Sequence, residues 1–251
     1  MCSASSIGLL MDLYSFPPLA AALDAVASTL AALTAALEPA LGGLSAAASV
    51  ILITVVVRTA LIPAGVAQAR ADRARARLAP RLRELQQRYR TDRERLQRET
   101  LKLYRDENVS PTAGCLPLLV QAPVVGLLYG VFIHPTIAGH ANGLLAETLF
   151  GVPLGSSLAG TVASGALPLT TGLVFGVVIA SIALVGELTR RAFRVTDAPA
   201  ALSGVLGVAQ FATAVIAVFV PLAAGLYLVV TVAWTLVQRL ILRRILPPIA
   251  A

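Results

Sequence analysis

Charge is scarce in this chain of 251 residues. Asp, Glu, Lys and Arg together make up 13% of it, and 57% of the residues are hydrophobic. Soluble domains are nearer to 25% charged. The scarcity of charge excludes an ordinary soluble protein and predicts an integral membrane protein.

The chain also lacks the residue patterns of several kinds of chemical site. It has two cysteines, Cys2 and Cys115, which fall in different parts of the predicted topology and suggest no disulfide framework. His134 and His140 have no acidic or cysteine companion at metal-ligand spacing, so we expect no metal site. The sequence has no Gly-rich phosphate loop, and an ATP-driven step is not expected.

The first 43 residues lack the basic start and cleavage site of a secretory signal. Asp24 and Glu38 stand among Ala and Leu in the stretch from Pro18 to Pro39. This pattern predicts a mildly amphipathic helix at a membrane surface within an extracytoplasmic segment, residues 1–43. A cleaved or membrane-spanning segment is the alternative.

Long apolar runs predict an all-α integral membrane protein, because a membrane span needs about 20 apolar residues. The charge-free run from Ala198 to Gln238 is about twice that length, and Pro221 marks the point where we expect it to fold back. The prediction is five transmembrane helices, of which the first is residues 44–66 and the other four lie within 115–245. Their bounds are about 115–133, 165–188, 202–220 and 222–242.

The positions of the basic residues predict an orientation. Of 20 Lys and Arg residues, Arg58 lies inside the first span, thirteen lie in 70–105, three in 190–194 and three in 239–244. Cytoplasmic loops of membrane proteins are enriched in Lys and Arg. We therefore expect a bacterial cytoplasmic membrane protein with its N-terminus outside and its C-terminal tail, residues 246–251, inside.

Residues 67–114 are predicted to form a basic cytoplasmic hairpin of two helices. Leu78, Leu82, Leu85 and Tyr89 repeat at helical spacing, and Leu96, Thr100 and Leu103 do so on a second helix. Thr91 with Glu94 predicts a capping box at the start of the second helix, and Pro80 is expected to kink or interrupt the first. The charges of this hairpin are interpreted either as a solvated face or as a docking surface for anionic lipid headgroups or ribosomal RNA.

Sequence motifs follow Arg58 in a fixed order. The basic hairpin leads into "NVSPTAGCLPLLVQAPVVGLLY" at residues 108–129. Later come "FGVPLG" at 150–155 and "YLVVTVAWTLVQRLIL" at 227–242. This order resembles that of the YidC/Oxa/Alb membrane protein insertases, in the layout of the short Gram-positive or actinobacterial members. Leu228 and Val232 depart from residues that are common in the family and suggest a divergent member.

The resemblance implies a function and a site. Family members move extracytoplasmic segments of nascent membrane proteins through a hydrophilic groove and release hydrophobic segments into lipid. The resemblance assigns Arg58, Gln121, Tyr227 and Trp234 to this groove. Because no bond is made or broken, we expect no enzyme, no catalytic residue and no cofactor. The implied partners are nascent membrane proteins, the ribosome and a Sec-type translocon, with anionic lipids at the basic hairpin and no DNA.

Arg58 admits other interpretations. A charge at the centre of a membrane helix costs about 2.5–3.5 kcal/mol on insertion scales. The structural alternative is an ion pair, for which Glu187 near the end of the third predicted span is the partner, or a side chain that snorkels toward the membrane surface. Among functions, the alternatives are a small channel or transporter for an anionic substrate, and a scaffold that recruits a partner through the basic hairpin.

Overall fold

The computed structural model describes residues 16–107, 116–165, 167–193 and 211–245. Contacts within the chain divide it into two compact units. The first unit contains residues 1–58 and 124–237, and the second contains residues 59–123 and 238–251. Each division falls inside a helical stretch of the chain.

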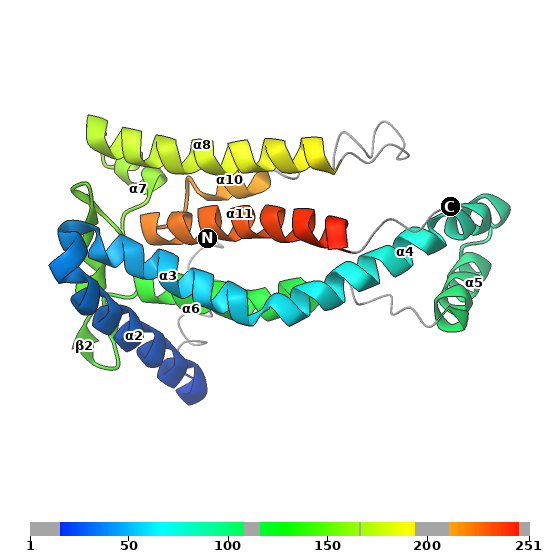
Figure 1. Cartoon of the computed structure of the whole chain (residues 1–251), viewed down its shortest axis with the longest axis horizontal. Coiled ribbons are helices and arrows are strands. Elements are labelled where there is room, and N and C mark those ends of the chain that lie inside the picture. Colours follow the sequence, from blue (N-terminus) through cyan, green and yellow to red (C-terminus); the bar gives the residue numbers. More distant parts are fainter. Residues whose placement is uncertain (1–15, 108–115, 166, 194–210, 246–251) are drawn as a thin grey trace, which may run out of the picture. The chain divides into compact units, whose positions relative to one another are not determined.

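Long helices make up most of the first unit (Figure 1). The connection between the first two is the 3-10 turn η1 (Gly42–Leu44), where Gly42 has a φ of 53°, a left-handed conformation that favours glycine. The predicted helical architecture is confirmed. In chain order the long helices are α2 (Pro17–Leu41), α3 (Ser45–Ala60), α6 (Leu116–Ile133), α8 (Leu169–Ala192) and α11 (Leu222–Ile245).

Within the described part of the chain, three stretches are long and apolar enough to cross a membrane: Pro17–Ala60, which contains α2 and α3, Leu169–Ala192 and Leu222–Ile245. The helix α6 lies where residues 115–133 were predicted to span, and it contains no charged residue. The predicted span 202–220 lies largely outside the described residues, and its described part contains the short helix α10 (Ala212–Ile216). The number of membrane-crossing helices therefore stays a prediction.

The first predicted span, residues 44–66, is wrong in one respect, because it is not a single helix. The helix α3 ends at Ala60, Leu61 lies in a turn, and α4 (Ile62–Arg88) begins at the next residue. Pro63 has no backbone N–H to donate to the carbonyl of Thr59, which explains the break. Arg58 consequently lies in the last turn of α3.

The helix α2 confirms the helix predicted over residues 18–39. Its Leu23 and Leu30 are buried in the core of the first unit, and its Thr34 hydroxyl donates to Ser49 Oγ of α3 at 3.2 Å. One face of α2 therefore packs into the unit. The placement of this helix at a membrane surface stays a prediction.

The core of the first unit is filled by apolar side chains from all five long helices. Phe175 and Ile182 of α8 are each 1% exposed, and Val50 of α3 is equally buried. The helices α8 and α11 approach closely at Gly225, where an added Cβ would lie 3.2 Å from Val178 Cγ1. Small residues permit this kind of close approach between membrane helices.

Two short hairpins follow α6, between the predicted spans 115–133 and 165–188. Strand β1 (Thr136–Ile137) pairs antiparallel with β2 (His140–Ala141), and β3 (Thr148–Leu149) pairs with β4 (Val152–Pro153). Each two-residue turn has two positive φ angles, 49° and 81° at Ala138 and Gly139, and 51° and 80° at Phe150 and Gly151. Such turns suit the twist of a tight hairpin.

The connecting region after α6 also supplies hydrogen-bond partners for backbone groups at the end of α6 and at the start of α11. The side-chain amide of Asn142 donates to the carbonyls of Val131 and His134 at the end of α6. At the start of α11, the N–H groups of Leu222 and Ala223 donate to the carbonyls of Ser156 and Leu154, at 2.8 and 3.1 Å. These helix-end groups have no partner inside their own helices, so the connecting region stabilises both ends.

In the second unit, α4 is followed by a turn and by α5 (Arg93–Asp106). Arg81 of α4 forms an ion pair with Glu107, the residue that follows α5. One detail of the predicted hairpin is wrong, because the cap of α5 is Asp92 rather than Thr91. The helix α4 continues through Pro80 without interruption, and a kink at Pro80 stays a prediction. The Asp92 carboxylate accepts a hydrogen bond from the Arg95 N–H at 2.9 Å.

Candidate functional site around Arg58

Arg58 is the charged residue of the apolar helix α3. The preceding residues, from Ile51 to Val57, are aliphatic except for Thr54. The Arg58 side chain is half-buried, and the helix ends two residues later at the turn before Pro63. The sequence thus places a permanent cation at the end of an apolar helix.

Tyr227 of α11 is a polar neighbour of Arg58, because its phenol interacts electrostatically with the guanidinium. Tyr227 itself is only 3% exposed. The predicted groove residues Arg58 and Tyr227 are therefore brought together from two helices that are far apart in the sequence.

A cavity of about 130 Å³ adjoins Tyr227. Its walls come from four helices, and Thr54 and Tyr227 are the two polar side chains among them. The Thr54 hydroxyl donates to the carbonyl of Val50 at 2.6 Å, which is a bond within its own helix. The complete lining is Val26, Ile53, Thr54, Val57, Leu127, Leu128 and Tyr227.

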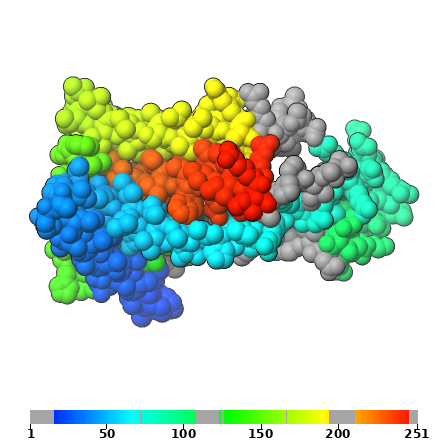
Figure 2. Space-filling view, in the orientation of Figure 1, coloured from blue at the N-terminus to red at the C-terminus, as the bar shows by residue number. Residues whose placement is uncertain are grey.

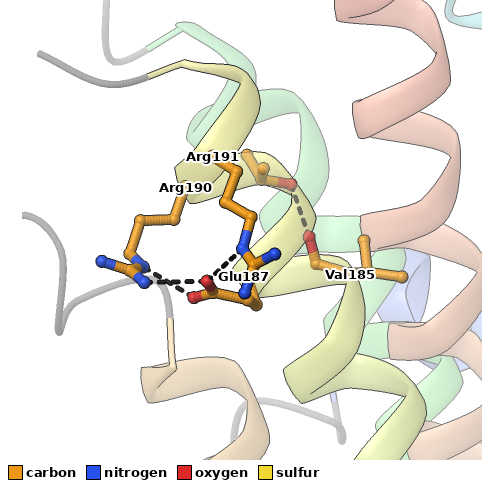
Figure 3. A network of polar contacts seen from close by, with 5 residues as sticks. Val185, Glu187, Arg190 and Arg191 are labelled. Atoms are coloured by element: carbon orange, nitrogen blue, oxygen red, sulfur yellow. Dashed lines mark hydrogen bonds and ion pairs between the residues drawn. The ribbon is translucent and has the colours of Figure 1, made fainter.

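Glu187 does not supply the ion pair that was the structural alternative for Arg58. On α8, its carboxylate accepts hydrogen bonds from Arg190 at 2.6 and 2.8 Å and from Arg191 at 2.6 Å (Figure 3). Both arginines lie one helical turn from Glu187 on the same helix. Among the ion pairs of the described residues, none includes Arg58.

Trp234 carries the clearest sign of a polar function on α11. Its indole Nε1 and the Thr231 hydroxyl oxygen are both buried, and within the described residues neither has a hydrogen-bond partner. Buried polar groups are satisfied in the great majority of cases, so these two exceptions, together with Gln238 Nε2 on the same helix, need an explanation. Tyr227, Thr231 and Trp234 follow at spacings of four and three, which places them on one face of α11.

Thr231 was not predicted as a site residue. Threonine is common in membrane helices, and its hydroxyl normally bonds to the helix backbone, as Thr235 does to the carbonyl of Thr231. The spacing from Tyr227 to Thr231 and Trp234 was the available signal. On the face drawn in Figure 2, the orange part of α11 lies between residues of α8 and residues of α3.

Gln121, the remaining predicted groove residue, has a backbone that belongs to α6. The position of its side chain lies outside what the structure describes. Its assignment to the groove therefore stays a prediction from the sequence.

Gln238 belongs to the second unit and was not predicted as a site residue either. Its side-chain amide lies directly against Gly65 of α4, where an added Cβ would be 2.0 Å from Gln238 Nε2. This nitrogen is buried and has no hydrogen-bond partner among the described residues. A larger residue at position 65 would force the Gln238 side chain to move.

Comparisons with known proteins give one consistent result. The 60Kd inner membrane protein family matches residues 37–248. The chain is 39% identical over 84 residues to the "Membrane protein insertase YidC" of Clostridium perfringens, covering 34% of this chain and 35% of the relative. It is 35% identical over 114 residues to the protein of that name from Streptomyces avermitilis, covering 42% and 27%.

A third relative with the same name comes from Actinobacillus pleuropneumoniae, at 38% identity over 93 residues, which is 37% of this chain and 17% of the relative. The chain thus spans about a third or less of the length of these curated relatives in each match. Their names support an insertase function.

Proposed function

The chain belongs to the 60Kd inner membrane protein family, and from this premise we propose that it is a membrane protein insertase. In this proposal it moves extracytoplasmic segments of nascent membrane proteins through a hydrophilic groove and releases their hydrophobic segments into lipid. The observation that carries the proposal is Arg58, a half-buried cation in an apolar helix with Tyr227 beside it.

An intramembrane cation is expensive and needs a role. The cost is about 2.5–3.5 kcal/mol on insertion scales, and such residues face the interior of a bundle or a water-filled cavity. Glu187, the carboxylate suggested by the sequence, is already bound by Arg190 and Arg191. Arg58 is therefore suited to attract an acidic or polar segment of a client protein.

The polar atoms of α11 fit the same role. Tyr227 lies beside Arg58. The Trp234 Nε1 donor is buried and has no hydrogen-bond acceptor among the described residues. A client backbone or a water molecule in the groove would supply that acceptor. We propose Arg58, Tyr227, Trp234 and Gln121 as the groove residues, with Thr231 added from its unsatisfied hydroxyl.

The free energy that drives release of the hydrophobic client segment comes from burying its apolar surface in lipid. A hydrophobic client segment gains about 25 cal/mol for each Å² of apolar surface removed from water. In the proposed orientation, with the N-terminus outside and the C-terminus inside, the membrane potential adds about 2.3 kcal/mol per charge per 100 mV for acidic segments that move outward. The protein lowers the barrier and needs no chemical step.

Nascent membrane proteins are the proposed substrates, and the ribosome and a Sec-type translocon are proposed partners. The basic segment from Arg70 to Arg105 carries thirteen Lys and Arg residues. In the proposed orientation it faces the cytoplasm, where its positive field attracts anionic lipid or ribosomal RNA.

The test is complementation in a bacterial strain depleted of its own insertase. The readout is insertion of a small client with an acidic extracytoplasmic tail, measured by protease protection. Wild-type protein is expected to restore insertion, and Arg58→Ala at equal membrane abundance is not. Failure of the wild-type protein, when it is stably present in the membrane, would overturn the proposal.

A channel or transporter for an anionic substrate is separated from an insertase by Arg58→Lys. A groove that needs only positive charge should tolerate Lys. A site that binds a carboxylate or phosphate through both arms of the guanidinium should not, because the Lys ammonium cannot reproduce that geometry.

A further inference from the structure

In the second unit, the arginine-rich part of α4 lies next to the arginine-rich C-terminal end of α11. Arg73 of α4 donates from Nη2 to the carbonyl of Leu242 in the last turn of α11, at 3.2 Å. That carbonyl is one of the four that an α-helix leaves without an internal partner at its C-terminus. Nearer the start of α4, Gly65 lies against Gln238. These two contacts hold α4 along the end of α11.

The contacts also fix which faces of the helices meet. Arg70, Arg73 and Arg77 lie at spacings of three and four, so they share one face of α4. On α11, Leu242 shares a face with Arg239 and lies next to Arg243. Because Arg73 reaches Leu242, the arginines of the two helices gather at one place, which we call the α4–α11 junction.

The charge of the junction is strongly positive. Residues 62–80 contain four arginines and one acidic residue, Asp72, and residues 238–245 contain three arginines and no acidic residue. Seven arginines and one aspartate give these two segments a formal net charge of +6. Arg70 and Arg244 are both exposed. A surface with this charge is complementary to a polyanion or to closely spaced phosphate groups.

The position of the junction selects among anionic partners. The candidate membrane span of α11 ends at Ile245, and its arginines lie in the last two turns. On α4, the residues from Ile62 to Ala69 contain no charge before Arg70. Cations at the end of an apolar helix lie at the depth of lipid headgroups, and basic sites between helices at this depth bind anionic lipids.

We propose that the α4–α11 junction binds the phosphate of an anionic phospholipid. The guanidinium groups of Arg recognise phosphate through two parallel hydrogen bonds, which gives the site geometric selectivity. The bound lipid would bridge α4 and α11 and stabilise the contact that Arg73 makes with Leu242. The inference does not depend on insertase activity and is tested without a client protein.

The experiment measures lipid binding to the purified full-length protein in zwitterionic detergent. The protein is titrated with phosphatidylglycerol and, in parallel, with phosphatidylcholine, and bound lipid is counted by native mass spectrometry. Thermal unfolding at each lipid concentration gives an independent affinity, because a ligand that binds the folded state raises the unfolding temperature. The wild type is expected to bind phosphatidylglycerol saturably and phosphatidylcholine weakly.

Two charge-matched double variants locate the site. Arg70→Gln with Arg244→Gln removes two exposed cations of the junction, and Arg90→Gln with Arg93→Gln removes two exposed cations at the turn between α4 and α5. Each Arg near a membrane surface contributes about 1 kcal/mol, and 1.4 kcal/mol is tenfold. The junction variant should therefore weaken phosphatidylglycerol binding by about 30-fold. The turn variant removes cations that add to the general field of the basic segment but lie outside the junction, so it should leave the binding within about threefold of wild type.

Three results would overturn the proposal. The first is equal weakening in both variants, which would mean that only total charge matters. The second is weakening in the turn variant alone. The third is a wild type that binds a short RNA oligonucleotide saturably at the junction but shows no saturable binding of phosphatidylglycerol. Both variants must retain the unfolding temperature of the wild type without lipid, and if the junction variant does not, Arg244→Gln alone replaces it, with Arg93→Gln as its control.

Discussion

The phenol of Tyr227 on α11 lies close enough to the guanidinium of Arg58 on α3 to interact with it electrostatically. Tyr227 is almost fully buried, while Arg58 is half-buried. Tyr227 and Arg58 thus belong to one local arrangement. Because no ion pair of the described residues includes Arg58, its charge is available to a third group.

The Tyr227 hydroxyl is expected to matter for insertion more than for folding. Tyr227→Phe keeps the ring in its buried position and removes only the hydroxyl. We predict a change in the free energy of unfolding of at most about 1 kcal/mol, with a several-fold slower insertion of an acidic client. Tyr129→Phe, on the more exposed Tyr129 of α6, is the control and should leave both unchanged. Normal insertion by Tyr227→Phe would exclude a role for the hydroxyl.

Asn142 is expected to stabilise the end of α6. Its side chain donates to the carbonyls of Val131 and His134 and accepts from the Leu144 N–H. Each bond contributes about 1 kcal/mol, so Asn142→Ala should lower the free energy of unfolding by about 2–3 kcal/mol. Denaturant unfolding in detergent measures this loss. His140→Ala, in the neighbouring strand, is the control and should change stability by less than about 0.5 kcal/mol.

The start of α5 offers a direct comparison of two adjacent residues. Asp92 accepts a hydrogen bond from the Arg95 N–H, and Thr91 precedes it without this role. Asp92→Ala should destabilise α5 by about 1 kcal/mol. Thr91→Ala should have little effect. Hydrogen exchange of the first-turn amides of α5 measures this difference. A larger effect of Thr91→Ala than of Asp92→Ala would show that Thr91 is the cap, as the sequence predicted.

The contact between Gly65 and Gln238 predicts a coupled pair of substitutions. A Cβ at position 65 would lie 2.0 Å from Gln238 Nε2, so Gly65→Ala must displace the Gln238 side chain. We expect a loss of about 1–3 kcal/mol, which is typical of overpacking. Gln238→Ala should rescue Gly65→Ala in a double-mutant cycle. Purely additive effects on the unfolding temperature would mean that the two side chains do not compete for this space.

The sequence predicted the helices well because their signals are local. Apolar runs and stretches without charge identified α2, α6, α8 and α11 close to their observed bounds. The break at Leu61 was missed, although Pro63 was visible in the sequence. An apolar run gives no periodic signal that distinguishes one helix from two, and the consequence of a single proline depends on the packing around it.

The candidate site could be predicted only in part. Arg58 was identified because a charge in an apolar run is conspicuous, and Tyr227 was assigned through the family resemblance. The unsatisfied atoms of Thr231 and Gln238 could not be read from the sequence, since the partner of a hydroxyl or amide depends on which helices meet. Likewise, Asn142 has a capping role that depends on how the hairpin from Thr136 to Ala141 folds back toward α6.

The most direct test of the central claim measures client insertion by the purified protein in proteoliposomes. Four proteins are compared: the wild type, Arg58→Lys, Arg58→Gln and Arg58→Ala. The client carries an acidic extracytoplasmic segment, and protease protection gives the initial rate. A second client with a neutral segment reports the part of the rate that does not depend on charge. Equal amounts of folded protein in the liposomes are established by unfolding temperature before comparison.

The account predicts that Lys retains most of the wild-type rate and that Gln and Ala lose at least tenfold with the acidic client. A loss of one charge interaction of about 1.4 kcal/mol corresponds to that factor. The neutral client should be affected less. Equal rates for all four proteins with the acidic client would contradict the claim that the Arg58 charge receives the translocating segment.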